Sequence, residues 1–417
     1  MAKWTSLRLN SACGDFRIGR KATGHPRRSA ESFAMRLPPL PAISAGLLAA
    51  FVGFASSFSV VLQGLVGVGA TQEQAASGIL ALSVAMGVCG ILVTLRTKMP
   101  ISIAWSTPGA ALLAGAGVPH GGFAAAIGAF ILAAALVTLS GLVKPIGRAM
   151  SAIPVSLANA MLAGILLPLC LAPVKAVAAM PLAGLAIVAV WFLVGRWSRV
   201  LAVPAAAVAT VLLILATHPA PMDQASAMPA PVFVAPDWSL ATMIGIGLPL
   251  FLITMASQNI PGLAVLKVNG FSPEPGPLFT VTGVFSLLCA PFGGHAVNLA
   301  AITAAICAGD EAGPDRARRW WAGVVSGLAY IAFGLAAGWV TVFAGQAPVL
   351  VQAMAGLALI GAFTNALSGT IAKAQDREAA ILCFVTTASG TAFLGISAPF
   401  WGLAVGGIAL FAARIRK

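Results

Sequence analysis

Long apolar runs joined by short connections are the feature that most limits what this chain can fold into. An apolar run of about 20 residues can cross the hydrocarbon core of a bilayer as a helix. The chain has 417 residues, of which only 8% are charged, so it cannot cover the surface of a soluble protein with charges. We predict an all-α polytopic membrane protein with 14 transmembrane segments, at about residues 42–69, 75–95, 100–118, 122–143, 155–173, 178–195, 200–217, 239–265, 277–290, 291–309, 321–343, 348–369, 379–394 and 396–413.

The Lys and Arg residues predict the orientation of these spans. With 14 spans, all but one of the 24 basic residues lie on the side of the N-terminal tail, and the exception is Lys175. Because basic residues favour the cytoplasmic side, both termini are predicted to be cytoplasmic. Residues 1–36 hold eight of the basic residues and are predicted to be a disordered tail, with Met35 as an alternative natural start. The net charge of +13 thus reflects membrane orientation and does not indicate nucleic-acid binding.

The third run is interrupted. Residues 100–105 favour an extended backbone. Ser106 and Thr107 are then good N-cap residues, and Pro108 suits the first turn of a helix that continues to about Gly117. Such a helix is about 15 Å long, half of the hydrocarbon core, and its free N–H groups make its N-terminus an anion site. The alternative is an ordinary membrane helix that tolerates a proline.

The tenth run is interrupted in a similar way. Residues 291–301 open with a proline, pass through the pair Gly293-Gly294 and continue as a predicted small-residue helix. Each interrupted run is the third of seven, and an odd number of spans per half implies inverted orientation. We therefore predict two inverted repeats, residues 37–217 and 238–417, joined by an outer loop at 218–237. In such a repeat the two half-helix N-termini converge near the membrane midplane.

Ionisable groups are almost absent from the apolar runs. All 11 acidic residues map outside the runs or to their edges, which disfavours a cation carrier or a channel lined by carboxylates. His295 alone among the four histidines lies deep, where an ionisable residue is a functional candidate. The alternative is a neutral imidazole that is hydrogen-bonded within the bundle. The six cysteines show no metal-binding spacing, and we predict neither a metal nor a cofactor.

Amide side chains inside the runs are further candidates. Gln63 lies in the first span, and Gln258 and Asn259 lie in the eighth beside a predicted Pro-Gly break. An amide in hydrocarbon needs a hydrogen-bond partner, supplied either by substrate or by another helix.

Three stretches resemble the bacterial benzoate:proton symporter family, namely residues 100–109, 256–262 and 291–300. The resemblance covers about residues 35–417. It implies a bacterial inner-membrane protein with the seven-plus-seven inverted-repeat fold of uracil permeases and sulfate transporters. Spans 1–4 and 8–11 would form a core domain. Spans 5–7 and 12–14 would form a gate domain, the expected interface of a homodimer.

The chain departs from the similar uracil permeases at two positions. Those permeases carry carboxylates in spans eight and ten, where this chain has Gln258 and Val297. The loss of two buried carboxylates argues against nucleobase transport and fits an anionic substrate.

The function expected from the resemblance is secondary active uptake of benzoate, or a similar aromatic carboxylate, with protons across the inner membrane by alternating access. The partners are this anion, protons and membrane lipid. Trp105 or Phe292 would line a slot for the ring, and His295 would carry the proton. The predicted substrate site consists of Ser106, Thr107, Gly109, Gln258, Asn259, His295, Asn298 and Gln63.

Alternatives to this function remain open from the sequence. The same fold could carry another organic or inorganic anion or act as an anion channel. A membrane enzyme is disfavoured because no His/Asp/Glu cluster lies at a membrane face. The proton could travel on the substrate itself, or Glu73 or Asp310 could take part.

Overall fold

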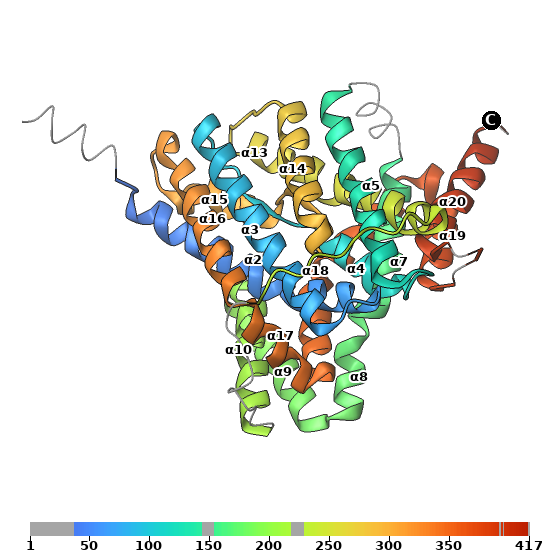
Figure 1. The fold of residues 1–417 in the computed structure, drawn as a ribbon, viewed down its shortest axis with the longest axis horizontal. Helices are drawn as coiled ribbons and strands as arrows, with labels where there is room; N and C mark the ends of the chain where they lie inside the picture. Colours follow the sequence, from blue (N-terminus) through green and yellow to red (C-terminus); the bar gives the residue numbers. More distant parts are fainter. Residues whose placement is uncertain (1–36, 144–153, 218–228, 392, 395, 416–417) are drawn as a thin grey trace, which may run out of the picture. The chain divides into compact units, whose positions relative to one another are not determined.

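The fold is described by a computed structural model over residues 37–143, 154–217, 229–391, 393–394 and 396–415 (Figure 1). The predicted tail at 1–36 lies outside the described residues. The elements of the first half are α2 (Leu40–Gly67), α3 (Gln72–Thr97), β1 (Ile103–Trp105), α4 (Thr107–Ala116), α5 (Gly122–Leu142), α7 (Val155–Cys170), α8 (Ala172–Ala179), α9 (Pro181–Trp197) and α10 (Arg199–Thr217).

The second half begins with one long helix of five parts, α11 (Leu240–Thr242), η2 (Met243–Gly247), α12 (Leu248–Thr254), η3 (Met255–Asn259) and α13 (Ile260–Val268). It continues with α14 (Pro275–Cys289), η4 (Ala290–Phe292), β2 (Val297–Leu299), α15 (Ile302–Ala308), η5 (Asp310–Ala312), η6 (Arg316–Arg318), α16 (Trp320–Leu335), α17 (Ala337–Gln346), α18 (Pro348–Ile371), η7 (Ala374–Asp376), α19 (Arg377–Ala388) and α20 (Ala398–Ile415).

Membrane-spanning helices make up most of these elements. Eight described helices are long and apolar enough to cross a membrane, or nine if α16 and α17, which meet at a bend of 54°, form one span. The predicted total of 14 spans stays a prediction, because the remaining candidates are shorter or interrupted.

The two halves of the chain interleave. Helix α3 packs on α16, whereas α14 packs on α5, so each pair draws one helix from each half. Helices α9, α10 and α18 share a separate apolar cluster, built around Ile187, Ala206 and Leu350. Figure 1 shows α8, α9, α10 and α17 gathered at the bottom of the view. The division into core and gate domains is consistent with this grouping and stays a prediction.

The described part of the predicted outer loop is extended and bound to the helices. Val232 N–H donates to Ser77 Oγ of α3 at 2.8 Å. Val234 N–H donates to the Pro291 carbonyl at 2.8 Å, and Asp237 N–H donates to that of Ala124 at 2.9 Å. Residues 229–237 therefore tie α3, η4 and α5 together.

The eighth predicted span differs from the expectation of a break at Pro261-Gly262. The helix runs on through Pro261, preceded by the π-helical turn η3. Proline lacks an N–H and its ring crowds the preceding turn, and the wider π-turn accommodates both effects.

The contact between α3 and α16 depends on two glycines. A Cβ at Gly87 would lie 2.5 Å from the Gly327 carbonyl oxygen, and a Cβ at Gly327 would lie 2.7 Å from that of Gly87. Backbones that approach this closely leave no room for a methyl group.

We expect Gly87→Ala to lower stability by about 1–3 kcal/mol, the usual cost of overpacking. Thermal unfolding of the purified protein in detergent measures this. The matched control is Gly407→Ala on α20, where an added Cβ meets no atom within 4 Å. An unchanged midpoint for Gly87→Ala would contradict the close-packed interface.

Candidate functional site

Two short strands from opposite halves of the chain form the centre of the molecule. β1 and β2 pair antiparallel, with Ile103 opposite Leu299 and Trp105 opposite Val297. Two backbone bonds extend the pair, from Ala300 N to the Ser102 carbonyl at 3.0 Å and from Ser106 N to the Ala296 carbonyl at 3.1 Å. The pairing satisfies backbone groups that no helix satisfies.

Small polar side chains from the surrounding helices hold each strand. Thr94 of α3 donates to the Ile101 carbonyl at 3.0 Å. Ser286 of α14 accepts from Val297 N–H at 2.8 Å. Helices α3 and α14 are the second span of each predicted repeat, so corresponding helices support corresponding strands.

Ser106 joins β1 to α4 and is fully buried. Its hydroxyl caps α4 by accepting from Gly109 N–H at 3.1 Å and pairs with the Thr254 hydroxyl at 2.9 Å. Its carbonyl receives Ala110 N–H at 2.8 Å and faces His295 Nε2 at 2.9 Å. All polar groups of Ser106 are therefore hydrogen-bonded within the protein. Ser106 thus positions the start of α4 and leaves no group free for a ligand.

The beginning of α4 has the local form predicted from the sequence. The helix starts at Thr107, after the N-cap Ser106, with Pro108 in its first turn. Thr107 is partly exposed, and its hydroxyl has no hydrogen-bond partner among the described residues. Gly109 is buried, and a Cβ there would lie 2.6 Å from a methyl carbon of Leu250. Among the predicted residues at this helix start, Thr107 is thus the one left available to a ligand.

The second interrupted segment differs from the prediction. The helix begins at Ile302 and not after the pair Gly293-Gly294, because residues 297–299 are used as the strand β2. Gly293 adopts a φ of +94° and turns the chain toward β1. His295 and Asn298 consequently lie before and within β2, not at a helix N-terminus.

His295 nevertheless lies beside the start of α4. It is 1% exposed, and its ring meets that of Phe130 edge-on with centroids 6.3 Å apart. Because a carbonyl only accepts, the contact with Ser106 assigns the ring proton to Nε2. Nδ1 is buried without a partner among the described residues. This nitrogen is an unused acceptor in the neutral ring.

The predicted amides take different places. Asn298 is fully buried. In the amide orientation that satisfies both of its ends, it accepts from Ser106 N–H at 2.9 Å and donates to the Leu299 carbonyl at 2.8 Å. Asn259 is also fully buried and accepts from Leu299 N–H at 2.9 Å. Gln258 is partly exposed, and no described residue hydrogen-bonds its amide.

An aromatic cluster lies next to β1. The Phe54 ring is 5.3 Å from that of Trp105, 5.9 Å from that of Phe58 and 5.2 Å from that of Phe333. Trp105 donates its indole N–H to Ser57 of α2 at 2.7 Å. Phe292, the other predicted ring contact, instead packs edge-on against Phe233.

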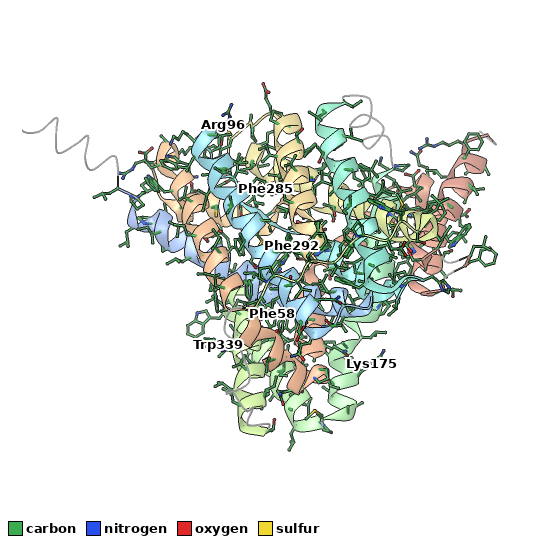
Figure 2. The ribbon with its side chains drawn as sticks, in the orientation of Figure 1. Phe58, Arg96, Lys175, Phe285, Phe292 and Trp339 are labelled. Carbon is green, nitrogen blue, oxygen red and sulfur yellow. The ribbon has the colours of Figure 1, made fainter. Side chains whose placement is uncertain are left out.

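Two cavities flank Phe58 along α2. The Arg196 cavity, of about 760 Å³, is lined by Val52 and Ser56 of α2 and by Arg196. The Gln63 cavity, of about 600 Å³, is lined by Leu62 and Gln63 of α2 and by residues of α4, α7, α8, α17 and α18. Phe58, labelled in Figure 2, lies on α2 between these two levels and packs against Ala207 of α10 and Met354 of α18.

The structure also contains contributors that were missed in the sequence. Thr254 holds the cap of α4, and Phe58 packs α2 against α10 and α18. Tyr330 of α16 is buried, and its hydroxyl has no partner among the described residues. Threonine and phenylalanine are common in apolar helices, so the sequence did not single out Thr254 or Phe58. Tyr330 is the one tyrosine of the chain, and this rarity was the signal that could have pointed to it.

Interleaved halves that each contribute a short strand to one paired centre define the class of this fold. The structure resembles the transmembrane domain of a cyanobacterial bicarbonate transporter, BicA, with a TM-score of 0.55 and 14% identity over 90% of this chain and 97% of that one. It also resembles the murine Slc26a9 anion transporter in its inward-facing state, with a TM-score of 0.59 and 12% identity over 95% of this chain and 73% of that one. These likenesses confirm the predicted fold class.

The chain belongs to the benzoate membrane transport protein family, whose profile matches residues 37–412. It is 40% identical over 375 residues to the inner membrane protein YdcO of Escherichia coli, covering 89% of this chain and 95% of that protein. It is 33% identical over 376 residues to the benzoate membrane transport protein of Acinetobacter baylyi, again covering 89% and 95%. The predicted resemblance is confirmed. The family is one of bacterial membrane transporters and not of enzymes.

We expect Asn259→Ala to lower the stability of the protein by about 1–3 kcal/mol, because it leaves Leu299 N–H buried without an acceptor. Gln258→Ala, the adjacent control, removes no hydrogen bond and should leave the unfolding temperature unchanged. Thermal unfolding in detergent distinguishes the two. Equal unfolding temperatures would show that Asn259 does not hold β2.

Proposed function

We propose that the protein takes up benzoate or a similar aromatic carboxylate together with protons across the bacterial inner membrane by alternating access. The observation that carries this proposal is the free Thr107 hydroxyl at the start of α4, beside an aromatic cluster and a buried histidine. A helix N-terminus favours an anion through its unpaired N–H groups and its dipole. The rings of Phe54 and Trp105 are buried in this conformation, and in our proposal a movement that uncovers them lets them contact the aromatic ring of the substrate.

The charges of the site support an anionic substrate. Residues 102–109 and 295–299 include no Asp or Glu, so no carboxylate there would repel an incoming anion. The Acinetobacter relative is named for benzoate, which favours this acid over other anions. In this proposal Ser106, Gly109, Asn259 and Asn298 position the backbone, while Thr107 and Gln258 face the substrate.

The two cavities support alternating access. They are lined by successive levels of α2, by Val52 and Ser56 in one and by Leu62 and Gln63 in the other, with Phe58 between these levels. By the predicted orientation, the Gln63 cavity faces outward and the Arg196 cavity faces the cytoplasm. Movement of α9, α10 and α18 past α2 would then open the substrate site to one side at a time.

His295 is the proposed proton carrier. A proton taken up at Nδ1 would create a charge in a low-dielectric surrounding, which an adjacent substrate carboxylate would stabilise. Substrate binding and protonation would therefore favour each other, as symport requires.

We expect Thr107→Leu to raise the Kd for benzoate roughly tenfold or more, because it removes a hydrogen bond to a charged group and fills the space at the helix start. Binding to the purified protein, followed by the benzoate-dependent shift in unfolding temperature, measures this. Thr107→Ser is the control because it keeps the hydroxyl. Wild-type affinity in Thr107→Leu would refute the proposed anion site.

We expect His295→Gln in proteoliposomes to lose gradient-driven accumulation of benzoate and to retain benzoate exchange. Glutamine can still donate to the Ser106 carbonyl but cannot carry a proton. Accumulation under an imposed pH gradient is compared with counterflow in the same vesicles. Unchanged accumulation with unchanged pH dependence would exclude His295 as the carrier.

A further inference from the structure

The Gln63 cavity is lined by a lysine side chain that the proposed substrate site does not use. Lys175 of α8 lines this cavity together with Gln63, Gln72 and Gln352. Lys175 is exposed and has no carboxylate partner among the described residues. None of the residues that line the cavity is acidic. The cavity therefore has a positive charge and no carboxylate in its lining.

The amide of Gln63 lies further along the same cavity. Its Nε2 is buried and has no hydrogen-bond partner among the described residues. A buried donor without a partner is costly, and a ligand oxygen would remove that cost. The cavity thus offers the Lys175 ammonium directly, and the Gln63 amide would become a second donor to a carboxylate once a rotation of its side chain brings Nε2 to the cavity.

The remaining walls are apolar. Leu62, Leu169 and Val351 contribute hydrocarbon surface from three different helices. The volume of about 600 Å³ lies within the usual range for small-molecule sites. A charged donor, an amide donor and an apolar wall together match a molecule with one carboxylate and one ring.

Lys175 also stands alone in the predicted topology. It is the single Lys or Arg that the predicted topology leaves on the outer side, so no other Lys or Arg supplies a positive potential there. Figure 2 shows Lys175 on α8, at the lower right of the view and apart from Phe58.

We propose that the Gln63 cavity is a receiving site for aromatic carboxylates, in which Lys175 attracts the carboxylate and Gln63 binds it before it passes to the start of α4. This inference rests on the proposed function, because it takes the carried anion and the outward orientation from it. A charge at a cavity mouth acts mainly on the rate of association, and its effect falls as salt rises. Removal of Lys175 should therefore alter capture and not the later steps.

The test is uptake of radiolabelled benzoate into right-side-out membrane vesicles at low and at near-physiological external salt. We expect Lys175→Gln to raise KM roughly three- to tenfold at low salt while the maximal rate is retained. The variant should also lose the salt dependence of KM, because screening weakens an attraction that is no longer present. Lys175→Arg should behave like the wild type.

Lys267→Gln serves as the matched control, since Lys267 is an exposed lysine on α13 that lines neither cavity. A wild-type KM and salt dependence in Lys175→Gln would overturn the receiving site, while uptake by the wild type would leave the proposed function standing. A wild type without saturable uptake of benzoate or substituted benzoates would overturn both. A fall in maximal rate at unchanged KM would show that Lys175 acts on a later step, which also refutes capture.

Discussion

Hydrogen bonding of non-helical backbone within an apolar molecule is the constraint on which this structure depends. Residues 101–106 and 295–300 leave the helical path, and their N–H and C=O groups cannot be left unpaired in hydrocarbon. They pair with each other as β1 and β2. Because one strand comes from each half, neither half can satisfy its own interrupted segment, and the two halves must fold together.

Side-chain hydrogen bonds support the strand pair, both within each half of the chain and between the halves. Thr94 of α3 bonds the Ile101 carbonyl just before β1, and Ser286 of α14 bonds Val297 of β2. Thr254, in the second half, holds the cap of α4 in the first. All three are neutral hydroxyl groups that add no buried charge: those of Thr94 and Ser286 bond backbone groups, and that of Thr254 bonds the Ser106 hydroxyl. In our proposal, the absence of a buried charge at these hydrogen bonds leaves the site able to accept an anionic substrate.

Two kinds of helix contact occur in the structure: direct backbone contact at glycines, and side-chain contact at Phe58. Glycine pairs such as Gly87 and Gly327 bring α3 and α16 into backbone contact, which favours a rigid unit. The contact between α2 and the helices α10 and α18 includes Ala55 and the side chain of Phe58, which pack against Ala207 and Met354. Such a contact can slide with little loss of hydrogen bonding. Our proposal places the movement of transport at this second kind of contact.

Much of the site's local chemistry was evident in the sequence. Ser106, Thr107 and Pro108 specify a helix start through short-range capping, so α4 begins where it was predicted to begin. The apolar runs likewise predicted the helices, because hydrophobic length acts within each segment. The resemblance of three motifs to the benzoate transporters was confirmed by the family match.

Other features depended on residues far apart in the chain. Residues 297–299 form a strand only because β1 lies beside them, so the predicted helix after Gly293-Gly294 begins at Ile302 instead. The engagement of Ser106 by His295, and the meeting of Gln63 with Lys175 in one cavity, join positions more than 100 residues apart. Local composition determines where a helix can start and which segments enter a membrane. Which buried polar groups remain unpaired is decided only when all of the helices have packed.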